Sequence, residues 1–208
     1  PKGLVGSEMC IRDSYLSEQW FLKMEDLAKP AISAVRNKEI NFYPNHWVKT
    51  YNHWMDNIQD WCISRQLYWG HQIPVWYKKD ADRSNQDNWF VSTTPPTDLE
   101  NWEQDNDVLD TWFSSWLWPF AVHGWPDIKT TKYFPTNALV TGPDIIFFWV
   151  ARMIMSGYEF MGDLPFKDVY FTSILRDDKG RKLSKSLGNS PDPITLFEKY
   201  GTDATRFS

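Results

Sequence analysis

The stretch Asn137-Ala-Leu-Val-Thr-Gly-Pro-Asp-Ile-Ile-Phe-Phe-Trp149 decides the fold. Its first five residues are typical of a buried strand, Gly142-Pro143 of a turn, and residues 144–158 of an apolar helix. A second apolar run, residues 169–174, predicts the next strand. Strand, helix and strand at this spacing indicate a βαβ unit, so we expect an α/β fold with a parallel sheet.

Ligand chemistry is expected where these two strands end, because ligands of open parallel sheets bind beyond the carboxyl ends of the strands. The turn at Gly142 and a basic, polar loop over residues 176–190 both fall at such ends. After that loop, Asp192 is predicted to cap a helix that starts with a proline. An earlier amphipathic helix is expected to end near Ile58 and to have Asn45 as its N-cap.

Composition excludes several classes of protein. Of the 208 residues, 42% are hydrophobic and 24% are charged, which is an ordinary globular mixture and not that of a disordered or fibrous chain. No apolar run reaches the roughly 18 residues that a membrane span needs. The net charge of −5 argues against a DNA-coating protein. Cys10 and Cys62 are too few for a disulfide framework or a four-ligand zinc site, so a cytoplasmic location without membrane or DNA partners is expected.

The most suggestive short motif is Lys182-Leu-Ser-Lys-Ser186 in the basic loop. Two lysines three residues apart, with hydroxyl groups between them and Gly188 after them, suit a mobile loop that clamps a polyphosphate. Lysine acts there as a compact positive charge, and serine adds hydrogen-bond donors. On spacing alone a solvated loop is the stronger interpretation, because short Lys/Ser strings are common.

The turn after the first strand carries a second candidate. Gly142 lets a ligand approach the backbone, and Asp144 can accept hydrogen bonds from ribose hydroxyls. The simpler alternative is that Asp144 only caps the helix. Trp112 offers a rigid wall for a small apolar ligand, and Ile145 and Trp149 share one helix face near the turn. Ordinary core packing is the alternative for these three, and the pattern alone favours it.

The order of the motifs is more specific than any one of them. Four strings follow one another: Trp61-Cys-Ile-Ser-Arg-Gln66, Asp110-Thr-Trp-Phe-Ser-Ser115, residues 141–153, and Lys182 to Asn189. In this the chain resembles the class I aminoacyl-tRNA synthetases, whose signature loop reads Lys-Met-Ser-Lys-Ser; here Leu183 replaces the methionine, a volume-conserving swap. The chain is most similar to the valine-specific branch, since the isoleucine and leucine branches usually have Asp-Ser-Gly after the Trp-Phe pair.

The resemblance, which covers about residues 15–208, implies a domain organisation. The fold class would be α/β, the C-terminal half of a class I Rossmann-like nucleotide-binding catalytic domain with a helical connecting segment. Residues 1–14 are expected to be a non-native remnant, 15–60 the connecting segment after an absent editing insertion, 61–176 the second half of the catalytic domain, and 177–208 the signature loop and the start of a helical region. The His-Ile-Gly-His-type signature of the first half is missing, so we expect the chain alone to be inactive.

The resemblance also implies roles for particular residues, with valine and tRNA(Val) as partners and with ATP and Mg²⁺ as the cofactors. Lys182, Lys185, Ser184 and Ser186 would act on the ATP phosphates and the leaving pyrophosphate. Gly142 and Asp144 would lie against the adenosine, and Trp112, Ile145 and Trp149 would form part of the valine pocket. No metal ligand is expected in the chain, because residues 78–82, where some relatives carry a zinc knuckle, contain no cysteine.

Two alternatives remain open from the sequence. The nearest is a paralogue specific for isoleucine, which would share the signature loop and the βαβ unit. The other is a non-catalytic module that binds a nucleotide or RNA through the basic loop.

Overall fold

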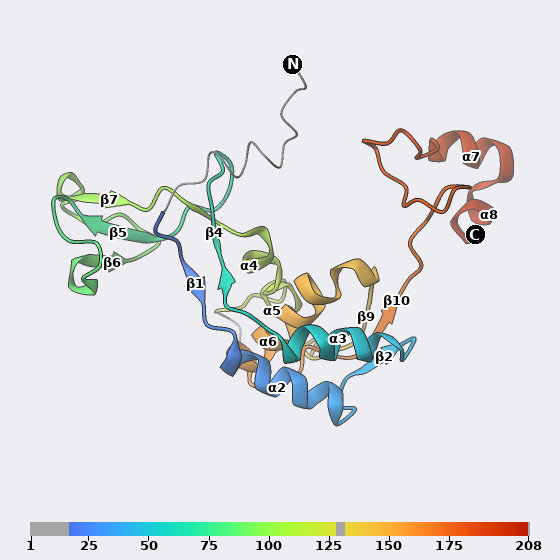
Figure 1. Ribbon diagram of the computed structural model, residues 1–208, viewed down its shortest axis with the longest axis horizontal. Coiled ribbons are helices and arrows are strands. Elements are labelled where there is room, and N and C mark those ends of the chain that lie inside the picture. Colours follow the sequence, from blue (N-terminus) through green and yellow to red (C-terminus); the bar gives the residue numbers. More distant parts are fainter. Residues whose placement is uncertain (1–16, 128–131, 208) are drawn as a thin grey trace, which may run out of the picture.

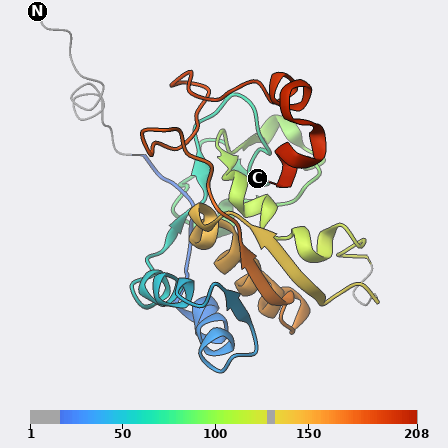
Figure 2. The same ribbon diagram turned by 90° about the vertical axis from the view of Figure 1, so that its right-hand side faces the viewer.

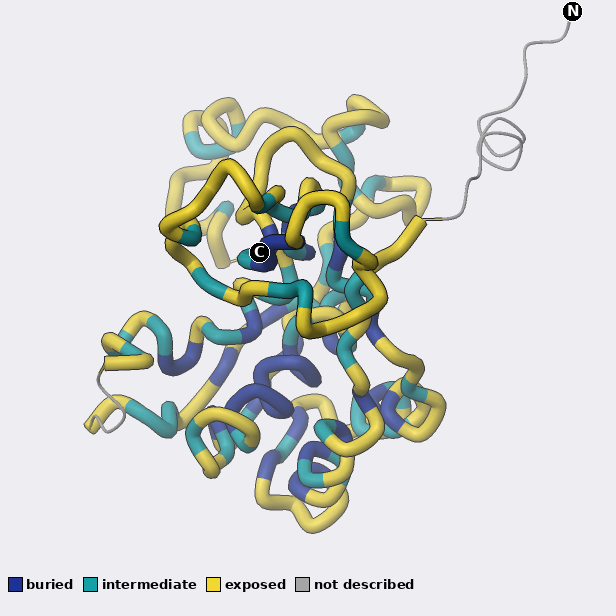
Figure 3. Tube along the Cα trace, turned by 90° about the vertical axis from the view of Figure 1, so that its left-hand side faces the viewer, coloured by how far each residue is buried: buried dark blue, intermediate teal, exposed yellow. Residues whose placement is uncertain are grey.

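A computed structural model describes residues 17–127 and 132–207, so the expected remnant over residues 1–14 lies outside the described part. Figure 1 shows three regions: a body of helices around a small parallel sheet, an antiparallel unit at one end, and the C-terminal loop and helices at the other. Buried residues gather in the body, as Figure 3 shows. No helix in these ranges has both the length and the apolar character that crossing a membrane requires.

The predicted parallel sheet is present. It consists of β2 (Asn41–Tyr43), β10 (Phe166–Phe171) and β9 (Thr136–Thr141), in the order β2-β10-β9 with parallel pairing throughout. Strand β10 was expected at 169–174, three residues too late, because its pairing already begins at Phe166 opposite Thr136. β2 was not expected at all; a three-residue strand is too short to show an alternating pattern.

The helical connection between β9 and β10 is also present, but little of it is an ordinary α-helix. Its parts are η3 (Pro143–Ile145, a 3₁₀ turn), η4 (Ile146–Ala151, a π-helix), α6 (Arg152–Ser156) and η5 (Gly157–Met161, a π-helix). It ends at Gly162, whose φ of 71° is a left-handed conformation that suits glycine. π-helical turns are rare and occur frequently at functional sites.

Two N-terminal helices, α2 (Glu25–Arg36) and α3 (Trp47–Asp56), pack on this connection and form the core with it. Tyr51 of α3 is buried, and its hydroxyl donates a hydrogen bond to the carbonyl of Ala31 in α2. The predicted cap Asn45 is wrong. The helix begins two residues later, His46 occupies the cap position, and its side chain makes no capping hydrogen bond.

The antiparallel unit contains β5 (Val75–Lys78), β6 (Trp89–Val91) and β7 (Trp102–Gln104), in the order β6-β5-β7. Short pairs connect it to the body: β1 (Phe21–Leu22) with β3 (Trp61–Cys62), and β4 (Ser64–Arg65) with β8 (Val108–Leu109). Trp20 and Tyr77 both donate to one carboxylate oxygen of Asp105, at 2.9 and 2.8 Å, which anchors the unit beside β1.

The remaining elements are short. They are η1 (Gln86–Asn88), η2 (Leu99–Asn101), α4 (Thr111–Ser115), α5 (Trp118–Ala121), α7 (Pro193–Tyr200) and α8 (Thr202–Phe207). The predicted cap of α7 is confirmed: the Asp192 carboxylate accepts a hydrogen bond from the N–H of Ile194, and Pro193 is the first helical residue.

The packing predicts where the fold is most sensitive. Ile154 of α6 is fully buried, so Ile154→Ala removes apolar contacts and leaves a cavity, and we expect a loss of about 2 to 5 kcal/mol in the free energy of unfolding measured in urea. Ile194→Ala is the control, because Ile194 is 58% exposed, and should cost less than about 0.5 kcal/mol. Equal losses in the two variants would contradict this account of the core.

Candidate functional site

The carboxyl ends of β9 and β10 lie side by side, as the βαβ prediction requires. The N–H of Thr172, just past β10, donates to the carbonyl of Thr141 at the end of β9, with a distance of 2.9 Å. Figure 2 shows the chain leaving both strands at the same edge of the sheet. The turn after β9 and the basic loop after β10 therefore start from neighbouring points.

The structure brings two of the predicted site residues into direct contact. The ammonium of Lys182 lies 2.6 Å from the Asp144 carboxylate, although the two residues are 38 positions apart. The hydrogen bond from Lys182 lowers the pKa of Asp144. Both side chains are substantially exposed, and an exposed ion pair stabilises a protein by at most about 1 kcal/mol. A ligand that binds Asp144 can therefore displace Lys182 from it, and a ligand that binds Lys182 can displace Asp144.

Gly142 leaves room for this carboxylate. A Cβ atom at Gly142 would lie 2.6 Å from an Asp144 carboxylate oxygen, a distance that real Cβ contacts do not show. Any larger side chain at this position would therefore displace the carboxylate from where Lys182 meets it. Asp144 does not cap η3 with a side-chain hydrogen bond, so helix capping, the alternative that the sequence left open, is not what the structure shows.

The basic loop is mostly exposed, but internal hydrogen bonds shape it. The Asp177 carboxylate accepts hydrogen bonds from Arg181 and from the Asn189 amide, whose oxygen in turn accepts the N–H of Ser184 at 2.8 Å. The pKa of Asp177 is lowered, first by the hydrogen bond from Asn189. These bonds hold together the two ends of the Lys182–Asn189 motif.

Within this framework the other predicted residues stay accessible. Lys185 is exposed, and its ammonium makes no ion pair or hydrogen bond within the described ranges. The hydroxyls of Ser184 and Ser186 lie 2.7 Å apart and hydrogen-bond to each other. One loop thus carries two exposed lysines, the exposed Ser186 and the partly exposed Ser184, which suits a polyanionic ligand.

A cavity of about 410 Å³ opens at the same edge of the sheet. It is lined by the start of α3, the turn after β9 and the chain after β10: Pro44, His46, Trp47, Pro143, Phe171, Thr172, Ser173, Ile174 and Arg176. Sequence reasoning missed His46 and Trp47 as site residues. No local pattern marked them, because β2, the strand that brings them to this edge, is too short to show an alternating pattern.

The three residues expected in an apolar pocket lie on neighbouring elements. Trp112 of α4 stacks on Phe148, with 6.0 Å between ring centroids, and the indole N–H of Trp149 donates to the carbonyl of Ser115 in α4. Both indoles pack against the core, whereas Ile145 is half-buried at the junction of η3 and η4. α4 is thereby fixed against η4, and a pocket shared by the three residues stays a prediction.

Asp110 is a residue that sequence reasoning did not single out, although it fixes the position of Trp112. One of its oxygens accepts the N–H of Trp112 at 3.0 Å and so caps α4. The other accepts the indole N–H of Trp61 at 2.9 Å and the guanidinium of Arg65 at 2.6 Å. Arg65 is therefore part of a structural ion pair with Asp110.

The buried Arg152 completes this network from the helical connection. Its guanidinium lies 3.5 Å from the centroid of the Trp61 ring, a cation–π contact. Burial lowers the pKa of Arg152 to about 10, so the side chain is still a cation at neutral pH. Trp61 thus lies between Arg152 of α6 and the Asp110 carboxylate that caps α4. These contacts connect the two helices. Among the described residues, no group of three or more His, Cys, Asp or Glu side chains is arranged to hold a metal ion.

Comparison with known proteins identifies the class. The family model for class I tRNA synthetases (I, L, M and V) matches residues 11–208. Methionyl-tRNA synthetase of Mycobacterium tuberculosis in complex with methionyl-adenylate has the same fold, with a TM-score of 0.64 and 22% identity over 92% of this chain and 33% of that one. The chain belongs to the class I aminoacyl-tRNA synthetases.

Within that class the similarity is to enzymes that are named for valine. The valine–tRNA ligase of Chlorobaculum tepidum is 58% identical over 205 residues, and that of Bacillus subtilis is 55% identical over 199. In both cases the alignment covers 94% of this chain and 22% of the relative. The chain therefore spans about a fifth of the length of the curated relatives it matches.

The contact between the loop and the turn leads to a prediction about charge. In Lys182→Ala the pKa of Asp144, followed by NMR of its carboxyl carbon, should rise toward the ordinary value of about 3.9, because its main stabilising hydrogen bond is gone. In the parent chain the Lys182–Asp144 pair stabilises the contact between the loop and the turn at pH values above about 3.9. This contribution is lost as the pH falls through the lowered pKa of Asp144.

Asp82 is the internal control for this titration. The pKa of Asp82 is lowered by hydrogen bonds from Ser84, which do not involve Lys182. This pKa should therefore be the same in the parent chain and in Lys182→Ala. A pKa of Asp144 that does not change in Lys182→Ala would show that the two groups are not in contact in solution.

Proposed function

We propose that the complete protein containing this chain activates valine with ATP and transfers it to tRNA(Val). In the first step a valine carboxylate oxygen attacks the α-phosphorus of ATP, the bond to the β-phosphate oxygen breaks, and pyrophosphate leaves. In the second step a 3′-terminal hydroxyl of the tRNA attacks the carbonyl carbon of valyl-adenylate, and AMP leaves. The similarity to valine–tRNA ligases supports this reaction.

The observation that carries the proposal is the meeting of Lys182 and Asp144 beyond the strand ends. In an in-line displacement the protein acts by positioning the reactants and stabilising the charge that develops on the leaving group. We assign Lys182, Lys185 and the hydroxyls of Ser184 and Ser186 to the phosphates and the leaving pyrophosphate.

Gly142 and Asp144 are assigned to the adenosine, with the Asp144 carboxylate on the ribose hydroxyls. The observed geometry supports this assignment, because the Asp144 carboxylate is exposed at the strand ends and its ion pair with Lys182 is weak. When the ribose hydroxyls hydrogen-bond to Asp144, they displace Lys182, which is then free to bind the phosphates. Binding of one ATP molecule would therefore place both side chains on the ligand. Mg²⁺ would arrive on the phosphate oxygens and offset part of their charge, and we assign no protein ligand to it.

Valine selectivity is assigned to an apolar pocket formed in part by Trp112, Ile145 and Trp149. Such a wall excludes larger side chains by steric contact, and Trp112 is held in place through the Asp110 cap. The names of the relatives favour valine over the isoleucine-specific alternative. A non-catalytic nucleotide-binding module would keep the basic loop but would not need this pocket. We also propose that the reaction takes place in the cytoplasm.

The proposal is tested by removing the free lysine. Lys185→Ala in the complete enzyme should lower the rate of valine-dependent ATP–pyrophosphate exchange by about 10²- to 10³-fold, the usual effect of losing one group that stabilises developing negative charge. The folded state should be unaffected, because Lys185 is exposed and its side chain supports no described contact.

Lys179→Ala is the matched control, since Lys179 is an exposed lysine of the same loop outside the motif. Its exchange rate should stay within about threefold of the parent, which corresponds to less than roughly 0.7 kcal/mol. Unchanged exchange in Lys185→Ala would remove the phosphate role of the loop, and exchange with isoleucine but not with valine would favour the paralogue.

A further inference from the structure

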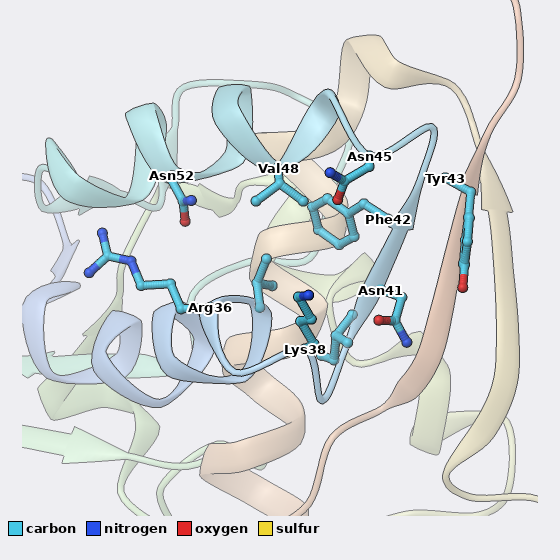
Figure 4. A pocket seen from close by; sticks show the side chains of 10 residues that line it. Arg36, Lys38, Asn41, Phe42, Tyr43, Asn45, Val48 and Asn52 are labelled. Carbon is cyan, nitrogen blue, oxygen red and sulfur yellow. The ribbon is translucent and has the colours of Figure 1, made fainter.

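The support of Trp112 bears directly on how a valine side chain would be selected. The strand-end cavity is lined by residues other than Trp112, Ile145 and Trp149, and so is a cavity of about 570 Å³ between α2, β2 and α3, which Figure 4 shows. Selection by the proposed apolar pocket therefore depends on how firmly its walls are held. Trp112 belongs to α4, a helix of only five residues, so its position is set by contacts with other elements.

The main chain of α4 is fixed at both ends by hydrogen bonds. At the start, the Asp110 carboxylate accepts the N–H of Trp112 at 3.0 Å. At the end, the carbonyl of Ser115 accepts the indole N–H of Trp149 at 3.1 Å. Neither bond involves the side chain of Trp112, so the orientation of its ring depends on what the ring packs against.

The ring of Trp112 stacks on that of Phe148. The ring centroids are 6.0 Å apart and the ring planes meet at 24°, which is within the range of favourable aromatic pairs. Phe148 is 45% exposed, whereas Trp112 packs against the core cluster. Trp112 is therefore held by the core and by one further ring that lies at the surface.

The ring of Phe148 is itself held within the helical connection. It lies 5.8 Å from the ring of Phe147 in an edge-to-face arrangement, and the guanidinium of Arg152 lies 5.6 Å from its centroid. Arg152 is buried and also lies over Trp61. The support that Phe148 gives to Trp112 is thus connected to the framework that holds Asp110.

The π-helical turn of η4 explains how two consecutive residues reach α4. A π-helix closes its hydrogen bonds over five residues, so each turn holds more residues and neighbouring side chains differ less in direction than in an α-helix. Phe148 and Trp149 both lie in η4. The first stacks on Trp112, and the second donates to Ser115. The rare geometry of η4 is thereby connected to the position of α4.

We propose that Phe148 is a positioning residue for valine selectivity, which acts by holding the indole of Trp112 at a fixed angle. The inference rests on the proposed function, since it takes Trp112 as a wall of the valine pocket. While Phe148 is present, the wall is rigid and excludes side chains larger than valine. Without this ring the indole can turn, so valine loses contact and isoleucine gains space. Phe148 is assigned no contact with a reactant.

Phe148→Leu in the complete enzyme tests the inference, because it keeps an apolar side chain and removes the ring. The ratio of kcat/KM for valine to kcat/KM for isoleucine, measured by ATP–pyrophosphate exchange, should fall about three- to tenfold, as the loss of one aromatic pair allows. The KM for valine should rise, whereas the KM for ATP should stay the same. Phe148→Tyr keeps the aromatic face and should retain the ratio of the parent.

Phe90→Leu is the matched control. Phe90 is 38% exposed and lies 6.0 Å from the ring of Trp102, but both rings belong to the antiparallel unit. The ratio should stay within about twofold of the parent in this variant. A double substitution separates positioning from general stability: in a Trp112→Leu enzyme, adding Phe148→Leu should change the ratio by less than about twofold, because the ring on which Phe148 acts is gone.

An unchanged ratio in Phe148→Leu, with an active parent, would overturn the inference alone. So would an equal fall in Phe90→Leu, or a fall that is the same with and without the indole of Trp112, because Phe148 would then act by another route. A parent enzyme without valine-dependent exchange would refute the proposed function and, with it, the role of Phe148.

Discussion

The parallel pairing of β9 with β10 is the constraint on which the site depends. Parallel strands must end at the same edge of the sheet, and the hydrogen bond from Thr172 to Thr141 fixes the relative position of those ends. Two chain segments about 30 residues apart in sequence therefore begin as neighbours. The contact between Lys182 and Asp144 follows from this arrangement, since each residue lies shortly after one of the two ends.

A second layer of interactions fixes the apolar part of the site to the same framework. The Asp110 carboxylate caps α4, accepts a hydrogen bond from the Trp61 indole and pairs with Arg65. The guanidinium of Arg152 lies over the ring of Trp61. The Asp110 side chain is 7% exposed and that of Arg65 is 40% exposed, so loss of Arg65 would leave a buried carboxylate without its cation. Trp112 is consequently positioned by the fold, whereas the basic loop is joined to the turn by one exposed ion pair. A rigid wall and a displaceable loop suit a site that orients one ligand and closes on another.

Sequence reasoning recovered the parts of this arrangement that have a local signature. The strand–turn–helix–strand pattern predicted the sheet and its functional edge, and Asp192 with Pro193 predicted the start of α7. It could not place β2, which is three residues long and pairs with a strand more than 120 positions away. It also could not find the Asp110–Trp61–Arg65 contacts, because they depend on which residues tertiary packing brings together. Asn45 failed as a cap because a suitable residue type is not enough when the helix starts two residues later.

The most direct test of the central claim, that the turn after β9 and the loop after β10 form one site, is a crystal structure of the complete enzyme with a non-hydrolysable valyl-adenylate analogue. We predict that the Asp144 carboxylate then lies on the ribose hydroxyls, that Lys182 has left it for the phosphate, and that the valyl side chain contacts Trp112. An analogue bound away from the strand ends, or one bound there while the Lys182–Asp144 pair remains intact, would contradict this account.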